Sequence, residues 1–384
     1  MSRWAGQGGR YRTLQRFFAT VLPWGLLFWV VLRHQVSWPG DVSRGAGDDV
    51  VVTKAGTCPP GLDRFCARLD GKPVPGVAFV TLSRVSGQAR RALPLRVEQV
   101  VRSEAETAAR QAKAAAKKPP ASCAKRRPGR PQGRQNKPKA DGTGPPELRR
   151  MASWLDALLH LVAGVLPLTS LVLDGPCGHH NALPLARQCR WHLIAKGRCD
   201  AALSSPDTGP YAGRGPHRKE GPELDYDHLP AHDLKETTVA GHIQTCVYPA
   251  PLRPKECPPP LHVVRLAKTT LHTQARAHVV LCSRDVDLAY TPRGDYYGRR
   301  CHIAFNFSEA TQYGGLEDFM NIPPPGVTHA AHLSLCMVNV AYRLRADVQP
   351  HAPDSSLLDL TADCRAYQYV EKTSKMLPAK PEPI

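Results

Sequence analysis

The chain has 384 residues, enough for two or three domains with a sizeable core, and 42% of them are hydrophobic, as in a globular protein. It carries 51 Lys and Arg against 33 Asp and Glu, a net charge of +18, which favours a polyanionic partner, with nucleic acid ahead of an anionic membrane surface. Its twelve cysteines are scattered singly, which favours reduced thiols and argues against a disulfide framework.

Residues 1–40 are expected to form short helices. Within them, residues 17–32 carry no charge and follow several arginines, a pattern shared by signal peptides and membrane anchors. The run is shorter than the roughly 20 residues that span a bilayer, and Pro23 and Gly25 interrupt it. A buried helix pair is therefore the preferred interpretation, with a membrane anchor formed by residues 17–32 as the alternative.

Three strand-like runs follow. The first is 47–54, which places Asp48 and Asp49 at the start of a strand. The other two are 77–85 and 92–101, both rich in β-branched and apolar residues. Three strands in succession predict a β-meander.

The composition changes to a basic arm in residues 106–146. Residues 107–140 hold eleven Lys or Arg and no acid. The segment 125–134 (KRRPGRPQGR) interleaves arginine with proline and glycine, and resembles AT-hook peptides that insert into the DNA minor groove. A solvated, flexible linker is the alternative. The residues expected to bind DNA are Arg126, Arg127, Arg130, Arg134 and Lys137.

A second α/β segment follows the arm. One apolar stripe predicts a helix over 147–165. The apolar run 168–173 then stops at Asp174, which indicates a buried strand with a carboxylate at its end. Sites in open α/β sheets lie at such strand ends, although an aspartate in a turn or at a helix N-cap has the same local sequence. Another buried strand is expected over 191–195.

The rest of the chain alternates in character. Residues 201–290 contain β-like runs among many prolines, glycines and histidines, and helices are expected over 296–312 and 330–344. We predict an α/β fold organised as follows: an N-terminal helical remnant (1–40), the first part of the core (41–105), the basic arm (106–146), the second part of the core (147–200), a β-rich insertion (201–290), closing catalytic helices (291–345) and a proline- and charge-rich tail (346–384).

Two aspartates at strand ends, more than a hundred residues apart, suit a divalent-cation site on one sheet. Two ions about 3.5–4 Å apart can activate the attacking oxygen and stabilise the leaving oxygen of a phosphodiester. Hard cations prefer oxygen ligands, so a third acid is needed, on a helix that closes the site. Two minor alternatives are zinc bound by the scattered cysteines and histidines after Asp174, and hydrolysis by Cys177, but neither has the required spacing.

Seven segments resemble the DDE transposases of bacterial insertion sequences, in the group with a β-stranded insertion and a Tyr-x2-Arg-x3-Glu-x6-Lys signature; cyanobacterial members are the most similar. These segments are 47–56, 71–79, 94–106, 126–133, 171–175, 234–239 and 315–321. The resemblance implies a ribonuclease-H-like mixed sheet flanked by helices, with hydrolysis and strand transfer at transposon ends. It further implies Mg²⁺ or Mn²⁺, double-stranded DNA as partner, no small-molecule cofactor, and a homodimer as one possible assembly.

By this resemblance Asp48 and Asp174 match the first two acids, and Tyr297 and Arg300 match the signature. Its glutamate and lysine are replaced by Ala304 and Thr311. Loss of one member of a catalytic constellation commonly costs on the order of a hundredfold in rate. The resemblance therefore implies a transposase with impaired catalysis, and a DNA-binding remnant without catalysis is the alternative.

Two further acids are weak metal-ligand candidates. Asp49 follows the first acid, and Glu309 lies about 140° around the helix from position 304. Gly314 replaces a tryptophan that the family usually carries, and the chain is shorter than the family at both ends, which together indicate a decayed or truncated copy. We expect a cytoplasmic, nucleoid-associated bacterial protein.

Overall fold

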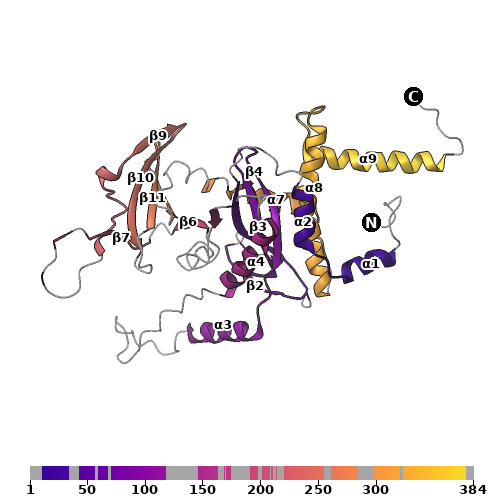
Figure 1. Cartoon of the computed structure of the whole chain (residues 1–384), viewed down its shortest axis with the longest axis horizontal. Coiled ribbons are helices and arrows are strands. Elements are labelled where there is room, and N and C mark those ends of the chain that lie inside the picture. The colour runs from indigo at the N-terminus through magenta and orange to yellow at the C-terminus, as the bar shows by residue number, and fades with distance from the viewer. Residues whose placement is uncertain are drawn as a thin grey trace.

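The structure is a computed structural model in which one mixed sheet of twelve described strands runs through the molecule (Figure 1). The residues that it describes are 11–33, 43–56, 59–67, 71–117, 146–162, 168, 170–173, 191–197, 201–207, 209–210, 213, 220–254, 261–283, 297–298, 300–320 and 323–377.

The first part of the sheet is the predicted meander. Strand β1 (Ser43–Thr53) pairs along its whole length with β3 (Pro73–Ser86), and β3 pairs with β4 (Arg91–Gln99); both pairings are antiparallel. A further short strand, β2 (Asp63–Cys66), pairs with the first residues of β3 and was not predicted.

Strand β1 begins earlier than predicted. Asp48 and Asp49 lie in its middle, so the prediction that they start the strand is wrong. The residues before them include Gly45 and Gly47, and glycine has a low strand propensity, which made this stretch look like a loop. Here glycine allows close packing, since a Cβ on Gly47 would come within 2.7 Å of the side chain of Leu173.

Two parallel strands extend the meander. The helix α4 (Pro146–Val162) precedes β5 (Ser170–Leu173), which pairs parallel with β1, and β6 (His192–Gly197) pairs parallel with β5. The strand order is therefore β4-β3-β1-β5-β6. This mixed α/β sheet is compatible with the predicted ribonuclease-H-like fold.

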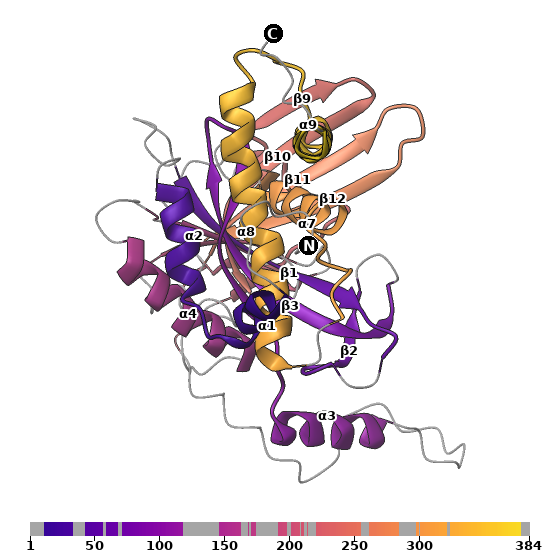
Figure 2. The ribbon, with the colours of Figure 1, turned by 90° about the vertical axis from the view of Figure 1, so that its right-hand side faces the viewer.

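Helices cover both faces of this part of the sheet (Figure 2). On one face, α4 packs its Leu155 and Leu158 against Leu171 and Leu173 of β5. On the other lie α7 (His302–Gln312) and α8 (Pro324–Val348). Side chains of successive strand residues alternate between these faces, so each strand contributes to both cores.

The segment 201–290 contributes β-strands that continue the same sheet. This segment is joined to the core by the antiparallel pairing of β12 (Arg276–Ser283) with β6. Buried Arg265 bonds the carboxylate of Asp233 and the carbonyl oxygen of Tyr248, which ties this region together. The strands are β7 (Leu203–Pro206), β8 (Glu220–Glu223), β9 (Glu236–Ala240), β10 (Ile243–Pro254), β11 (Leu261–Thr270) and β12 (Arg276–Ser283).

The N-terminal apolar run forms two helices, α1 (Tyr11–Ala19) and α2 (Trp24–Arg33). Helix α2 packs on β4 and α8 and buries Trp24, whose Nε1 donates to Nδ1 of His329 at 2.7 Å. None of the described helices is by itself long and apolar enough to cross a membrane; α1 and α2 together would be, but the pair bends by 104°.

Two helices lie at the periphery in Figure 1. The first is α3 (Glu104–Lys117), at the start of the basic arm, which begins with a capping box between Ser103 and Glu106. The C-terminal tail, to which the sequence analysis assigned no helix, forms α9 (Leu357–Met376). Its capping box between Ser356 and Asp359 is a sequence signal that could have predicted it.

The packing of α2 against α8 should make stability depend on pH through His332. Burial lowers the pKa of His332 to about 4, and its ring stacks on Trp24. An unfolded histidine has a pKa near 6.5, so the unfolded chain binds more protons between these values. Stability is therefore lost as the pH falls from about 6.5 to 4, by roughly 3 kcal/mol.

This is measurable by chemical denaturation at pH 7.5 and pH 4.5. The variant His332→Leu should lose less stability between the two pH values than the wild-type protein, whereas His351→Leu, at an exposed histidine, should behave like wild type. Equal losses in all three proteins would contradict the assignment to His332.

Candidate catalytic site around Asp48

Asp48 lies where β1 runs beside the end of β5. Gly47 of β1 is opposite Leu173, the last residue of β5, in parallel register. The residue after Gly47 is Asp48, and the residue after Leu173 is Asp174. Asp174 lies outside the described residues. On its other side, Asp48 pairs with Thr81 of β3.

Both carboxylate oxygens of Asp48 have partners. Arg300 Nη1 donates to Asp48 Oδ2 at 2.7 Å, and the backbone N–H of Asp49 donates to Oδ1 at 2.9 Å. The side chains of Asp48 and Arg300 are 4% and 11% exposed, so this ion pair is buried. Burial raises the cost of leaving either charge alone.

The predicted residue Tyr297 lies beside this pair. The guanidinium carbon of Arg300 is 5.7 Å from the centre of the Tyr297 ring. The same ring packs against a buried cluster that includes Ala46 of β1 and Ile303 of α7. The fold thus brings together Asp48, Tyr297 and Arg300, from segments about 250 residues apart.

The residues that replace the reactive positions of the signature lie on α7, which falls within the helix predicted over 296–312. Ala304 is exposed and Thr311 is half-buried. Arg300 lies just before this helix, and Ala304 is in its first turn. The methyl group of Ala304 supplies no oxygen ligand.

Neither of the weaker acid candidates lies beside the Asp48 carboxylate. Glu309, the only acid on α7, accepts hydrogen bonds from Arg91 Nη2 at both carboxylate oxygens, each at 2.7 Å. Asp49 follows Asp48 in a strand, so its side chain points to the opposite face of the sheet.

The described residues alone do not fit a site for two divalent ions. In the described part of the chain, no three His, Cys, Asp or Glu side chains cluster around a position for a metal ion. The carboxylate of Asp48 is bonded to Arg300 instead. The expected DNA-binding residues of the arm also lie outside the described residues; they are Arg126, Arg127, Arg130, Arg134 and Lys137.

Sequence reasoning missed Lys54, which joins two of the motif segments. Its Nζ donates to the carbonyl oxygens of Glu317 at 2.9 Å and Phe319 at 2.6 Å, and lies 3.8 Å from the centre of the Phe319 ring. Burial lowers the pKa of Lys54, against the opposing effect of Asp318 and Glu317. The segments 47–56 and 315–321 are therefore in contact, which their separate positions in the sequence could not show.

A protein-family model described as "DDE superfamily endonuclease" matches residues 1–248. The chain belongs to this family. No curated protein sequence matches the chain significantly.

The family match includes the positions of Asp48 and Asp174 and ends before α7. Enzymes of the DDE superfamily generally use divalent metals bound by carboxylates. In this DDE endonuclease, Ala304 and Thr311, at the signature positions that the resemblance indicates, lie beyond the residues that the family match covers.

Replacing Arg300 by glutamine should leave the Asp48 carboxylate buried without a counter-charge. Removing one partner of a buried pair typically costs about 3–5 kcal/mol. We expect Arg300→Gln to lower the free energy of unfolding by a few kcal/mol, and the double variant Asp48→Asn, Arg300→Gln to recover part of that loss. Urea denaturation of the wild type, both single variants and the double variant gives the coupling energy; strict additivity would contradict a direct interaction.

Proposed function

We propose that this DDE endonuclease acts as a transposase on the DNA ends of an insertion sequence, and that its strand-cleaving step is impaired. The observation that carries the proposal is the buried pairing of Asp48 with Arg300 beside the end of β5. Four residues after Arg300, where the resemblance expects a glutamate, the chain has Ala304. The first two acids of a DDE site, Asp48 and Asp174, are retained, whereas Ala304 and Thr311 replace the glutamate and lysine of the signature.

The strand register supports a shared site for the two aspartates. Neighbouring strands lie about 4.8 Å apart, and consecutive Cα atoms are about 3.8 Å apart. Because Leu173, the residue before Asp174, is opposite Gly47, the residue before Asp48, we propose that the two carboxylates share one site. Mg²⁺ or Mn²⁺ is the cofactor that we propose for this position.

Arg300, which pairs with Asp48, has a second role in this proposal. Its guanidinium neutralises Asp48, and an arginine in this place can instead donate to a phosphate oxygen. Release of Asp48 by Arg300 would free Oδ2 to hold a cation. Binding of DNA phosphate by Arg300 would therefore favour release of the carboxylate.

A DNA-binding remnant without catalysis is the second candidate. It is favoured by the same ion pair, because both oxygens of Asp48 already have hydrogen-bond partners. The two candidates differ in a measurable way: only the impaired transposase should regain cleavage when the missing side chains are restored.

Restoring the signature should raise DNA cleavage. In an assay with a labelled transposon-end duplex and Mg²⁺ or Mn²⁺, we expect little or no cleavage by the chain as it stands. The double variant Ala304→Glu, Thr311→Lys should cleave roughly tenfold faster or more, since a single ligand commonly contributes on the order of a hundredfold.

The matched control is Gln312→Glu, which adds a carboxylate at an exposed position of the same helix, about 12 Å along the helix axis from position 304. It should leave cleavage unchanged. Adding Asp48→Asn or Asp174→Asn to the restored variant should abolish the gain. If cleavage survives either replacement, the proposed metal site is wrong, and if restoration gives no cleavage, the non-catalytic remnant is favoured.

The basic arm should make DNA binding depend on salt. Each phosphate contact contributes about −0.9 to the slope of log affinity against log salt concentration for duplex DNA. Replacing the five arm residues Arg126, Arg127, Arg130, Arg134 and Lys137 by alanine should flatten the slope by about four units if each contacts a phosphate. Fluorescence anisotropy of a labelled duplex at several salt concentrations measures this, and an unchanged slope would exclude the arm as a contact.

A further inference from the structure

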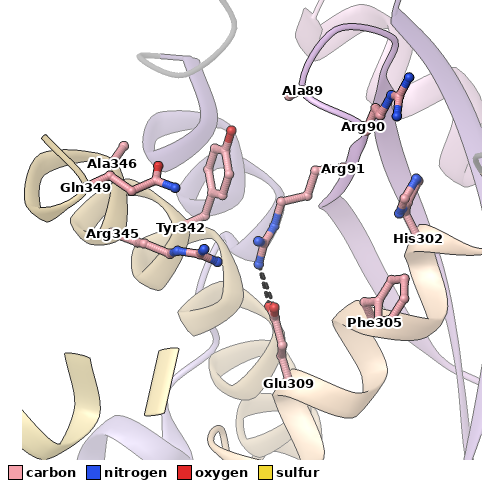
Figure 3. Close-up of a pocket in the computed structure, with 10 residues that line it drawn as sticks. All are labelled: Ala89, Arg90, Arg91, His302, Phe305, Glu309, Tyr342, Arg345, Ala346 and Gln349. Atoms are coloured by element: carbon pink, nitrogen blue, oxygen red, sulfur yellow. Dashed lines mark hydrogen bonds and ion pairs between the residues drawn. The ribbon is translucent and has the colours of Figure 1, made fainter. Parts of the chain in front are cut away.

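A pocket of about 560 Å³ lies on the side of α7 that carries His302, Phe305 and Glu309 (Figure 3). Three elements form its walls. The turn between β3 and β4 contributes Arg90, α7 contributes Phe305, and α8 contributes Tyr342. The complete lining is Ala89, Arg90, Arg91, His302, Phe305, Glu309, Tyr342, Arg345, Ala346 and Gln349.

The pocket has an excess of positive charge. Glu309 neutralises Arg91, whose guanidinium also lies over the ring of Tyr342, with its carbon 4.9 Å from the ring centre. The charges of Arg90 and Arg345 are not offset by any other acid in the lining. This composition favours an anionic ligand.

Arg345 lines the pocket from α8. In Figure 3 its guanidinium extends from α8 toward Arg91. An anion between the two arginines would accept hydrogen bonds from the Nη atoms of Arg345.

The other side of the pocket offers an exposed aromatic face. Phe305 is 60% exposed although it lies on the first turns of a helix that packs against the sheet. Aromatic rings next to arginines are typical of surfaces on which nucleic-acid bases stack. The volume exceeds what one phosphate group requires and falls within the range of pockets for nucleotide-sized ligands.

The backbone of Arg90 is a further sign of function. Its φ of 48° lies in the left-handed region, which is unfavourable for residues other than glycine and asparagine. Strained residues of this kind persist most often at binding and catalytic sites. Glycine would fit the turn more easily but would remove a charge from the pocket.

We propose that this pocket binds one nucleotide of a DNA strand. A phosphate contacts Arg345 beside the Arg91–Glu309 pair, and the base or sugar lies against Phe305, with Arg90 on the next part of the strand. The inference rests on the proposed function and adds a contact on the side of α7 away from the altered signature.

The test measures binding of fluorescent single-stranded and duplex oligonucleotides to the full chain. Arg345→Gln and Phe305→Ala should each weaken binding roughly threefold to tenfold, and Arg345→Gln should reduce the salt slope by about 0.7–0.9. The matched control is Arg343→Gln on the same helix, where the arginine is paired with Asp347. It should bind DNA like the wild type.

A second variant separates binding from folding. Arg90→Gly relieves the left-handed backbone, so its thermal midpoint should be equal to or higher than that of wild type while DNA binding falls. An oligonucleotide containing iodouracil should also cross-link to the peptide that contains Phe305. Loss of stability together with loss of binding in Arg90→Gly would favour a structural role and contradict the proposal.

The outcomes distinguish this inference from the proposed function. If the intact chain binds DNA with a salt-dependent affinity, but the pocket variants behave like Arg343→Gln, only the pocket assignment is wrong. If the intact chain shows no salt-dependent DNA binding, the proposed function itself fails. A mononucleotide that binds the intact chain as tightly as an oligonucleotide would overturn the assignment to a strand.

Discussion

Strand β1 lies inside the sheet and holds the buried carboxylate of Asp48, for which Arg300 provides the counter-charge. An unpaired buried charge costs several kcal/mol, so Asp48 requires a counter-charge or a cation in the folded chain. In the described structure the counter-charge comes from just before α7, about 250 residues away in the sequence. The same contact therefore fixes where α7 begins relative to β1.

Once α7 is fixed in this way, its sides have separate roles. Ile303, Asn306 and Ala310 are buried toward the sheet and α8. Ala304 is exposed, and Glu309 faces the basic pocket through its pair with Arg91. Glu309 cannot supply a carboxylate on the side of Ala304, because its position on the helix and its arginine partner both direct it elsewhere. The glutamate that the resemblance expects at position 304 thus has no substitute within this helix.

Much of the fold follows from sequence patterns, but the exceptions have physical causes. The meander, the α4 helix and the buried β5 and β6 strands follow from apolar periodicity. The start of β1 was missed because Gly45 and Gly47 are there for close packing, which periodicity does not detect. Short β2 depends on its pairing with β3, so no local pattern could reveal it.

The candidate site was accessible to sequence reasoning only in part. The acid-bearing strand and the signature residues Tyr297 and Arg300 could be named, but the direct pairing of Arg300 with Asp48 depends on tertiary structure. Lys54 and the pocket beside Glu309 were not predicted, since their partners come from distant segments. Contacts between distant segments produce no periodic pattern in the sequence, whereas the buried faces of strands and helices produce periodic apolar patterns.

The positions that depart from the family are not equally easy to restore, and the packing explains why. Ala304 is exposed, so a longer side chain there meets little resistance. Gly314 is different: a Cβ would lie 2.8 Å from the carbonyl oxygen of Ala310 and 3.0 Å from that of Ser334, whose hydroxyl also bonds the Gly314 carbonyl. Both contacts are with backbone, which cannot rotate away as a side chain can. A tryptophan at 314 would therefore require α7 and α8 to separate, whereas a glutamate at position 304 would not require the core to repack.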